Sequence, residues 1–155
     1  MIPGSKLGDD SVDRPGKPGF REGSGARTLG DINLLFYERD SEEHLNRLFQ
    51  KLTVYGIDKS FAAIFTGIPA NENEIASKQL ARIVKETAFS GALFDYRKFF
   101  GQFATSSAVA AAYALTCIRK DSLPSLIADR NARLTGRGIL LLGLGRTLSA
   151  IEITP

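Results

Sequence analysis

The chain has 155 residues and a mass of 16.8 kDa, a size that favours one domain with a genuine hydrophobic core and argues against a second full domain. Hydrophobic residues make up 43% and charged residues 24% of the sequence, a balance that excludes a chain disordered throughout. Twenty Lys and Arg against seventeen Asp and Glu leave a formal charge of +3, which is too small and too scattered to indicate a nucleic-acid surface.

Cysteine and histidine are each present once, as Cys117 and His44. A single cysteine excludes an intramolecular disulfide and a Cys-cluster zinc site, and a single histidine excludes multi-histidine metal centres. No apolar segment has the form of a signal peptide or the length of a membrane span. We therefore expect a cytoplasmic protein without a membrane span or a bound metal.

Residues 1–26 are rich in Gly and Pro interleaved with charged side chains. Such a segment buries too little apolar surface to offset its chain entropy. We expect a flexible or extended arm over residues 1–26 and a folded domain over residues 27–155.

The domain begins with a strand pattern followed by a helix pattern. Residues 32–37 form an apolar, β-rich run that predicts a strand. Asp40 and Glu43 have the spacing of a capping box, and the following pattern predicts a helix that ends at Gly56. Its apolar stripe consists of Leu45, Leu48, Phe49 and Leu52.

The same alternation repeats in the middle of the chain. Residues 61–65 predict a second strand. Asn71 and Glu74 repeat the capping spacing before an apolar stripe that reaches Val84, which predicts a second helix. Residues 92–96 predict a short third strand.

The last third of the chain predicts one helix and two strands. Residues 103–119 are crowded with Ala and Ser on nearly every side, and we expect this helix to lie in the middle of the packing. Residues 138–142 and 149–153 predict a closing hairpin joined through residues 143–146. The order β-α-β-α-β-α-β-β predicts an α/β fold with a mixed sheet and helices packed against it.

Four segments resemble motifs of one protein family, in the family's order. Residues 20–26 (F-R-E-G-S-G-A) are similar to L-G-E-G-A-G-A, and residues 66–72 (T-G-I-P-A-N-E) resemble the end of H-G-T-G-T-P-L-N-D. Residues 97–102 lie where the family has K-S-x-x-G-H, and residues 143–147 lie where it has G-F-G-G-x. The chain resembles the C-terminal half of a β-ketoacyl synthase, a thiolase-like condensing enzyme, or of a chain-length-factor partner of such a synthase. Its predicted element order is also that of one thiolase half.

The resemblance implies a thiolase-like fold and a role in fatty-acid or polyketide biosynthesis, but the family's catalytic residues are replaced. On this alignment Ile64 and Gln102 stand at the two histidines, and Arg97 stands at the lysine. Isoleucine can neither donate a hydrogen bond to an oxyanion nor exchange a proton, and glutamine donates but does not titrate. We therefore assign no catalytic residue and expect an acyltransferase-like subunit that is inactive alone.

The resemblance also implies a substrate-binding region. It would be formed by Thr66 and Gly67 in one loop and by Gly143, Leu144 and Gly145 in another. Arg146 stands where the family has glycine, and its side chain would crowd an acyl entrance beside Leu144.

The expected partners follow from the same resemblance. Half of a thiolase-like enzyme exposes the face on which the other half packs, and a large exposed apolar surface marks a partner. The sequence therefore predicts pairing with a condensing-enzyme subunit or a homo-oligomer. Arg130, Arg133 and Arg137 form a loose basic cluster, for which contact with an acidic acyl carrier protein and a solvated loop are the two interpretations.

Two other functions remain open at this stage. The chain completes a split β-ketoacyl synthase or acyltransferase whose cysteine comes from a partner, or it is a ligand-binding or structural module on a thiolase-like fold. Cys117 lies within a predicted apolar helix, which indicates a buried structural cysteine, and His44 is expected on the solvated side of the first helix. The G-L-G turn at residues 143–145 lacks the rest of a dinucleotide fingerprint, so we expect no cofactor.

Overall fold

The computed structural model describes residues 29–128 and 132–155. The expected arm over residues 1–26, the family-like segment at residues 20–26 and Arg130 of the basic cluster lie outside the described residues.

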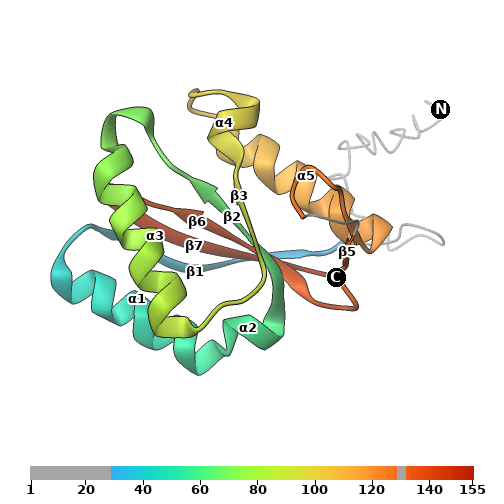
Figure 1. Ribbon diagram of the computed structural model, residues 1–155, viewed down its shortest axis with the longest axis horizontal. Helices are drawn as coiled ribbons and strands as arrows, with labels where there is room; N and C mark the ends of the chain where they lie inside the picture. The colour runs from blue at the N-terminus through green and yellow to red at the C-terminus, as the bar shows by residue number, and fades with distance from the viewer. Residues whose placement is uncertain (1–28, 129–131) are drawn as a thin grey trace, which may run out of the picture.

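The described chain forms a mixed sheet with helices on both faces (Figure 1). The strands of this sheet are β1 (Asp31–Arg39), β2 (Phe61–Gly67), β3 (Ala92–Asp95), β6 (Gly138–Gly143) and β7 (Thr147–Thr154). The helices are α1 (Glu42–Tyr55), α2 (Ile57–Ser60), α3 (Asn73–Thr87), α4 (Tyr96–Phe100) and α5 (Ser106–Lys120). A 3₁₀ turn at Ala70–Glu72 and the short pair β4 (Ser122–Leu123) and β5 (Ala132–Arg133) complete the described elements.

The sheet has the strand order β1-β7-β6-β2-β3. Strands β6, β2 and β3 are parallel, whereas β7 is antiparallel to both of its neighbours, β6 and β1. All seven residues of β2 are buried because this strand has a neighbour on each edge and helices over each face. The prediction of an α/β fold with a mixed sheet is confirmed at this level.

Helices α1 and α3 cover one face of the sheet side by side (Figure 1). The predicted stripe of α1 is buried against the sheet, as the 3.6-residue period requires. The predicted start of this helix was one residue too early, since Ser41 is the cap and its hydroxyl accepts a hydrogen bond from the backbone N–H of His44 at 3.0 Å. Gly56 ends α1 in the left-handed conformation, with φ +70°, which favours glycine.

Helix α5 covers the opposite face, and here the sequence prediction was wrong. The helix was expected in the middle of the packing, but only one stripe of it is buried, and Ala108, Val109 and Ala112 are exposed. The small side chains let α5 approach the sheet closely, yet no second layer of described residues covers its outer side. The buried stripe consists of Ser106, Ala110, Ala114, Cys117 and Ile118.

Two boundaries near the carboxyl ends of the strands also differ from prediction. The third strand ends at Asp95, and Tyr96 begins the short helix α4, with Asp95 accepting a hydrogen bond from Arg97 N–H at 3.2 Å. Aromatic residues in this stretch favour a strand by propensity, but the aspartate cap and Gly101 limit it to one helical turn. Asn71 does not cap a helix, because a 3₁₀ turn precedes α3.

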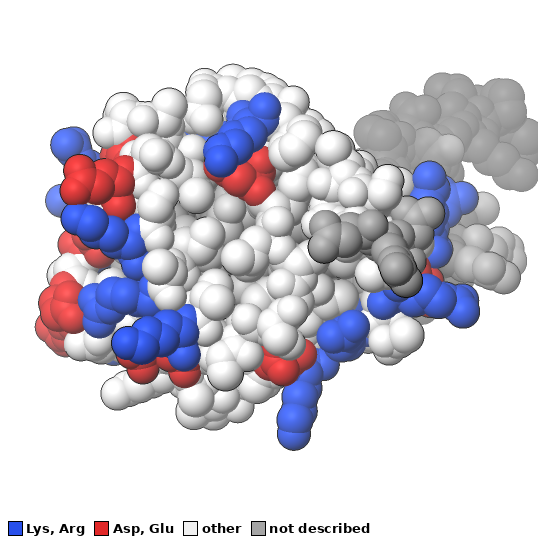
Figure 2. Space-filling view, in the orientation of Figure 1, with Lys and Arg blue, Asp and Glu red and all other residues white. Residues whose placement is uncertain are grey.

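The charged side chains are interleaved in sign. Figure 2 shows lysine, arginine and carboxylate side chains mixed over α1 and α3, and an uncharged band through the middle of the same face. The helices in the described part of the chain are all too short or too polar to cross a membrane.

Candidate functional site

A polar pocket of about 280 Å³ lies at the carboxyl ends of β2 and β6. The ends of both strands and the loops after them, the first turns of α4 and α5 and the start of β7 supply its wall. Its lining residues are Gly67, Pro69, Glu72, Tyr96, Arg97, Ser107, Gly143, Leu144, Arg146, Thr147 and Ser149.

Five of the residues singled out from the sequence meet in this wall. They are Gly67, Arg97, Gly143, Leu144 and Arg146. Thr66 lies beneath the wall, 1% exposed, and its hydroxyl donates to the carbonyl of Phe94 at 3.4 Å.

Ile64 does not reach the pocket. Its side chain is fully buried in the core between the sheet and the α1–α3 layer. Position 64 is three residues before Gly67 on β2, and the alternation of side chains along a strand directs it to a different face from its neighbours at 63 and 65. Ile64, which stands at the first of the two family histidines, therefore lies apart from Arg97 and Gln102 at the other two matched positions.

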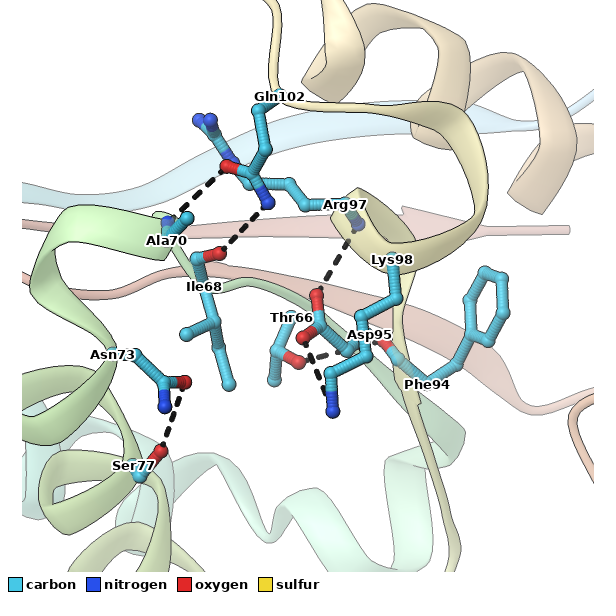
Figure 3. A network of polar contacts seen from close by, with 10 residues as sticks. All are labelled: Thr66, Ile68, Ala70, Asn73, Ser77, Phe94, Asp95, Arg97, Lys98 and Gln102. Atoms are coloured by element: carbon cyan, nitrogen blue, oxygen red, sulfur yellow. Dashed lines mark hydrogen bonds and ion pairs between the residues drawn. The ribbon is translucent and has the colours of Figure 1, made fainter.

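Gln102 lies next to the pocket and holds the loop after β2. Its Oε1 accepts a hydrogen bond from the backbone N–H of Ala70 at 3.3 Å, and its Nε2 lies 3.5 Å from the carbonyl oxygen of Ile68. Figure 3 shows this side chain reaching from the segment after α4 onto the loop. Both ends of the amide are engaged with backbone, so Gln102 acts as a clamp on the loop.

Arg97 brings a positive charge into the wall from α4. Its guanidinium side chain is half-buried and runs toward the loop at Ala70 (Figure 3). Its Nε is buried without a hydrogen-bond partner among residues 29–128 and 132–155. Asp95 accepts from the backbone N–H of Arg97 and lies 3.9 Å from the ammonium of Lys98. Its carboxylate therefore contacts these groups and not the guanidinium of Arg97.

Tyr96 supplies a hydroxyl that the sequence analysis did not find. The residue is 3% exposed, and its hydroxyl lies directly against Gly67, where a Cβ would overlap it. Burial raises the pKa of Tyr96 above its ordinary value, and the neighbouring Arg97 charge offsets part of that rise. The phenol therefore stays protonated at neutral pH and can donate a hydrogen bond.

Helix α3 fixes the loop between β6 and β7. The buried side chain of Gln79 accepts from Gly145 N–H at 2.7 Å and donates to the Gly145 carbonyl at 3.0 Å. Glu72 accepts from the backbone N–H of Arg146 at 2.9 Å. Gly145 has φ +111°, and a Cβ there would overlap Glu72, so only glycine fits this contact. Gln79 carries no local sequence signal, because its partner is 66 residues away.

Arg146 does not turn inward over Leu144 as the sequence analysis expected. Its side chain is 84% exposed and lies 3.7 Å from Glu72. It contributes to the rim of the pocket and leaves the interior open.

Other candidates lie elsewhere. Cys117 is buried, as predicted, and burial raises the pKa of its thiol, which makes it a poor nucleophile. His44 is half-buried rather than freely solvated, with Nδ1 2.8 Å from the Arg39 carbonyl. No group of three His, Cys, Asp or Glu within the described residues is placed to hold a metal ion.

The pocket combines two guanidinium groups, a phenol and hydroxyls with one carboxylate. Its lining residues include Glu72, Tyr96, Arg97 and Arg146 but not histidine, the side chain that most often transfers protons in enzymes. Such a wall suits the binding of a polar ligand better than proton transfer. Searches of protein-family models, of curated proteins and of solved structures find no match to this chain.

Proposed function

We propose that the chain is a β-ketoacyl-synthase-like subunit that does not itself catalyse condensation and that pairs with an active condensing enzyme. The observation that carries the proposal is the convergence of three family-like segments on one pocket. Gly67, Arg97 and the pair Gly143–Leu144 come from positions far apart in the sequence and line the same wall. The order of strands and helices along the chain, which the resemblance implies, supports the same proposal.

The non-catalytic part rests on the residues at the three matched positions. Ile64 is fully buried in the core, Gln102 is engaged with backbone groups, and the guanidinium of an arginine does not act as a proton acceptor in proteins. A condensing site needs a group that exchanges a proton and a donor aimed at the developing oxyanion. None of the three supplies proton exchange.

The pairing part rests on a side of the sheet, at β1, that residues 29–128 and 132–155 leave exposed. On the face that α5 covers, the side chains of Ile32, Leu34 and Tyr37 are 52%, 63% and 67% exposed. We call these three residues the β1 patch. Apolar side chains left in water on a sheet face favour association, since burying them is worth about 25 cal/mol per Å².

The outer side of α5 extends the same surface. No charged residue lies in the helix before Arg119, and Val109 is 40% exposed. A surface helix ordinarily presents charged residues to water, whereas a helix that is uncharged all round is typical of burial. A protein partner against the β1 patch and α5 would remove both surfaces from water.

An activity assay tests the non-catalytic part. The isolated chain is incubated with a malonyl-carrier substrate, alone and with a condensing enzyme that has its cysteine, and release of carbon dioxide is measured. We expect no release from the chain alone. Release by the chain alone that is lost in Gln102→Ala, but kept in Gln50→Ala on the exposed side of α1, would contradict the proposal.

A further inference from the structure

The pocket lies where the chain changes direction across the sheet. From β2 the chain passes through α3, on one face, to β3, and from β3 it returns through α5, on the other face, to β6 on the opposite side of β2. In open α/β sheets, the crevice outside the carboxyl ends of the strands at such a switch point is where ligands bind. Residues from the loops after β2 and β6 line this crevice.

The charge of the wall favours an anion. Glu72 is the single carboxylate in the wall, and it accepts from the Arg146 backbone and lies 3.7 Å from the Arg146 guanidinium. The charges of Glu72 and Arg146 therefore offset each other, and Arg97 contributes the remaining positive charge. The buried Nε of Arg97 has no partner in the described part of the chain, and a buried guanidinium donor left unpaired is costly.

The remaining donors face the same crevice. Ser107 lies in the first turn of α5, where the helix dipole favours negative charge. The neighbouring backbone N–H groups of Ser106 and Ala108 already bond to the carbonyls of Phe103 and Thr105. Tyr96 and Ser149 add hydroxyls to the wall. Each of these hydroxyls can donate a hydrogen bond to an anion.

The size of the pocket limits the ligand. Its volume of about 280 Å³ lies below the usual range for sites that enclose drug-sized ligands, which begins near 300 Å³. A carboxylate or phosphate group fits, whereas a long acyl chain does not fit within this pocket alone.

From these observations we propose that the pocket is a binding site for a small oxyanion, a carboxylate or a phosphate, held by Arg97. The guanidinium of Arg97 pairs two N–H groups with two anion oxygens. Tyr96 and Ser107 donate to the same anion. This inference does not depend on pairing with a condensing enzyme.

Binding of simple probes to the isolated full chain tests the site. Inorganic phosphate and acetate are titrated by calorimetry, with acetamide as an uncharged probe of the same shape as acetate. We expect saturable binding of an anion with a dissociation constant on the order of 1 mM, and no measurable binding of acetamide. The tighter of the two anions identifies the ligand as a phosphate or a carboxylate.

Variants assign the binding to Arg97. Arg97→Gln should weaken anion binding at least about tenfold, and Lys98→Gln should leave it unchanged, since Lys98 is outside the wall and 74% exposed. Amide resonances of Gly67, Ser107 and Gly143 should shift on titration. If Arg97→Gln fails to fold, Arg97→Lys takes its place, and we expect weaker binding because the forked donor is lost.

Three results would contradict the proposed anion-binding site. They are the absence of saturable anion binding, equal affinities for acetate and acetamide, and an unchanged dissociation constant in the Arg97 variant. Leu34→Asp on the β1 patch should retain anion binding whether or not it disrupts pairing. The two proposals can therefore fail separately.

Discussion

On one face of the sheet the two long helices α1 and α3 lie side by side, whereas on the other face α5 is the one long helix, with α4 and the β4–β5 segment beside it and the edge strand β1 left exposed (Figure 1). We call these the two-helix face and the one-helix face. Leu48 and Leu52 on the two-helix face are 0% exposed, while Leu34 on the one-helix face is 63% exposed. The one-helix face has a buried core of its own, in which Phe65 and Ile139 are 0% exposed, but its apolar side chains on β1 stay available for a partner.

The two faces also differ in their polar contacts across the fold. Gln79 of α3 holds the loop between β6 and β7 through two hydrogen bonds, and Tyr55 of α1 donates to Glu152 of β7. On α5 the hydroxyl of Thr116 bonds only within its own helix, to Ala112. The two-helix face thus carries the hydrogen bonds that fix the loop between β6 and β7, whereas the loop after β2 is held by Gln102, from the segment after α4.

The largest expected difference between the faces concerns apolar truncation. Leu52→Ala should lower the free energy of unfolding by about 3 kcal/mol, because it removes fully buried methyl groups and leaves a cavity. Leu34→Ala should change it by less than about 0.5 kcal/mol in the isolated chain. Urea unfolding followed by circular dichroism measures both, and equal losses would remove the distinction between the faces.

A second comparison concerns the polar ties. Gln79→Met keeps the side-chain length but leaves the buried N–H and carbonyl of Gly145 without their partner, at an expected cost of about 2 kcal/mol. Thr116→Ala, the matched change on α5, should cost less than about 0.5 kcal/mol. The same unfolding experiment measures both variants. A Gln79→Met protein as stable as the wild type would show that the loop between β6 and β7 keeps its conformation without these hydrogen bonds.

A third prediction uses the pH dependence of stability. The hydrogen bond to Glu152 raises the pKa of Tyr55 above 10.0, so the folded state keeps a proton that the unfolded state loses. This contribution is fully present below pH 10.0 and is lost as the pH rises through the higher pKa of the folded state. Tyr55→Phe should flatten the alkaline loss of stability without abolishing it, because Tyr96 and Tyr113 also have raised pKa values. An unchanged alkaline slope in this variant would contradict the prediction.

The smallest expected effect lies at the surface of the two-helix face. Lys78 and Glu74 form an ion pair at 2.8 Å, with side chains 73% and 83% exposed. Water and salt screen such a pair, so Lys78→Gln should leave the unfolding midpoint unchanged. A clear shift of the midpoint would mean that surface charge contributes to the difference between the faces.

Much of the fold could be predicted because its signals are local. The apolar run at residues 61–65 and the stripe from Leu45 to Leu52 each carry their period within a dozen residues, and both are found buried. The position of α5 could not be predicted in this way. Its small side chains indicate that another element packs closely against the helix. They do not indicate on how many sides, and among the described residues only the sheet side is covered.

The site divides in the same way. Gly67, Arg97 and Leu144 were found through short motifs, and they do line one pocket. Gln79 and Tyr96 were missed because their roles depend on partners in other segments, Gly145 and Gly67, which only the folded chain brings near. Ile64 was placed by alignment alone, and the core position of its side chain could be known only from the strand's orientation in the sheet.

The mass of the native particle tests the pairing face most directly. Three proteins are compared: the wild type, Leu34→Asp in the β1 patch, and Val54→Asp as a control on α1, where Val54 is 89% exposed. Each is produced in the cells that make the protein naturally, is purified, and has its mass measured by light scattering. We predict a particle heavier than the 16.8 kDa chain for the wild type and the control, and a single chain for Leu34→Asp. A wild-type monomer, or one mass shared by all three proteins, would contradict the assignment of this face to a partner.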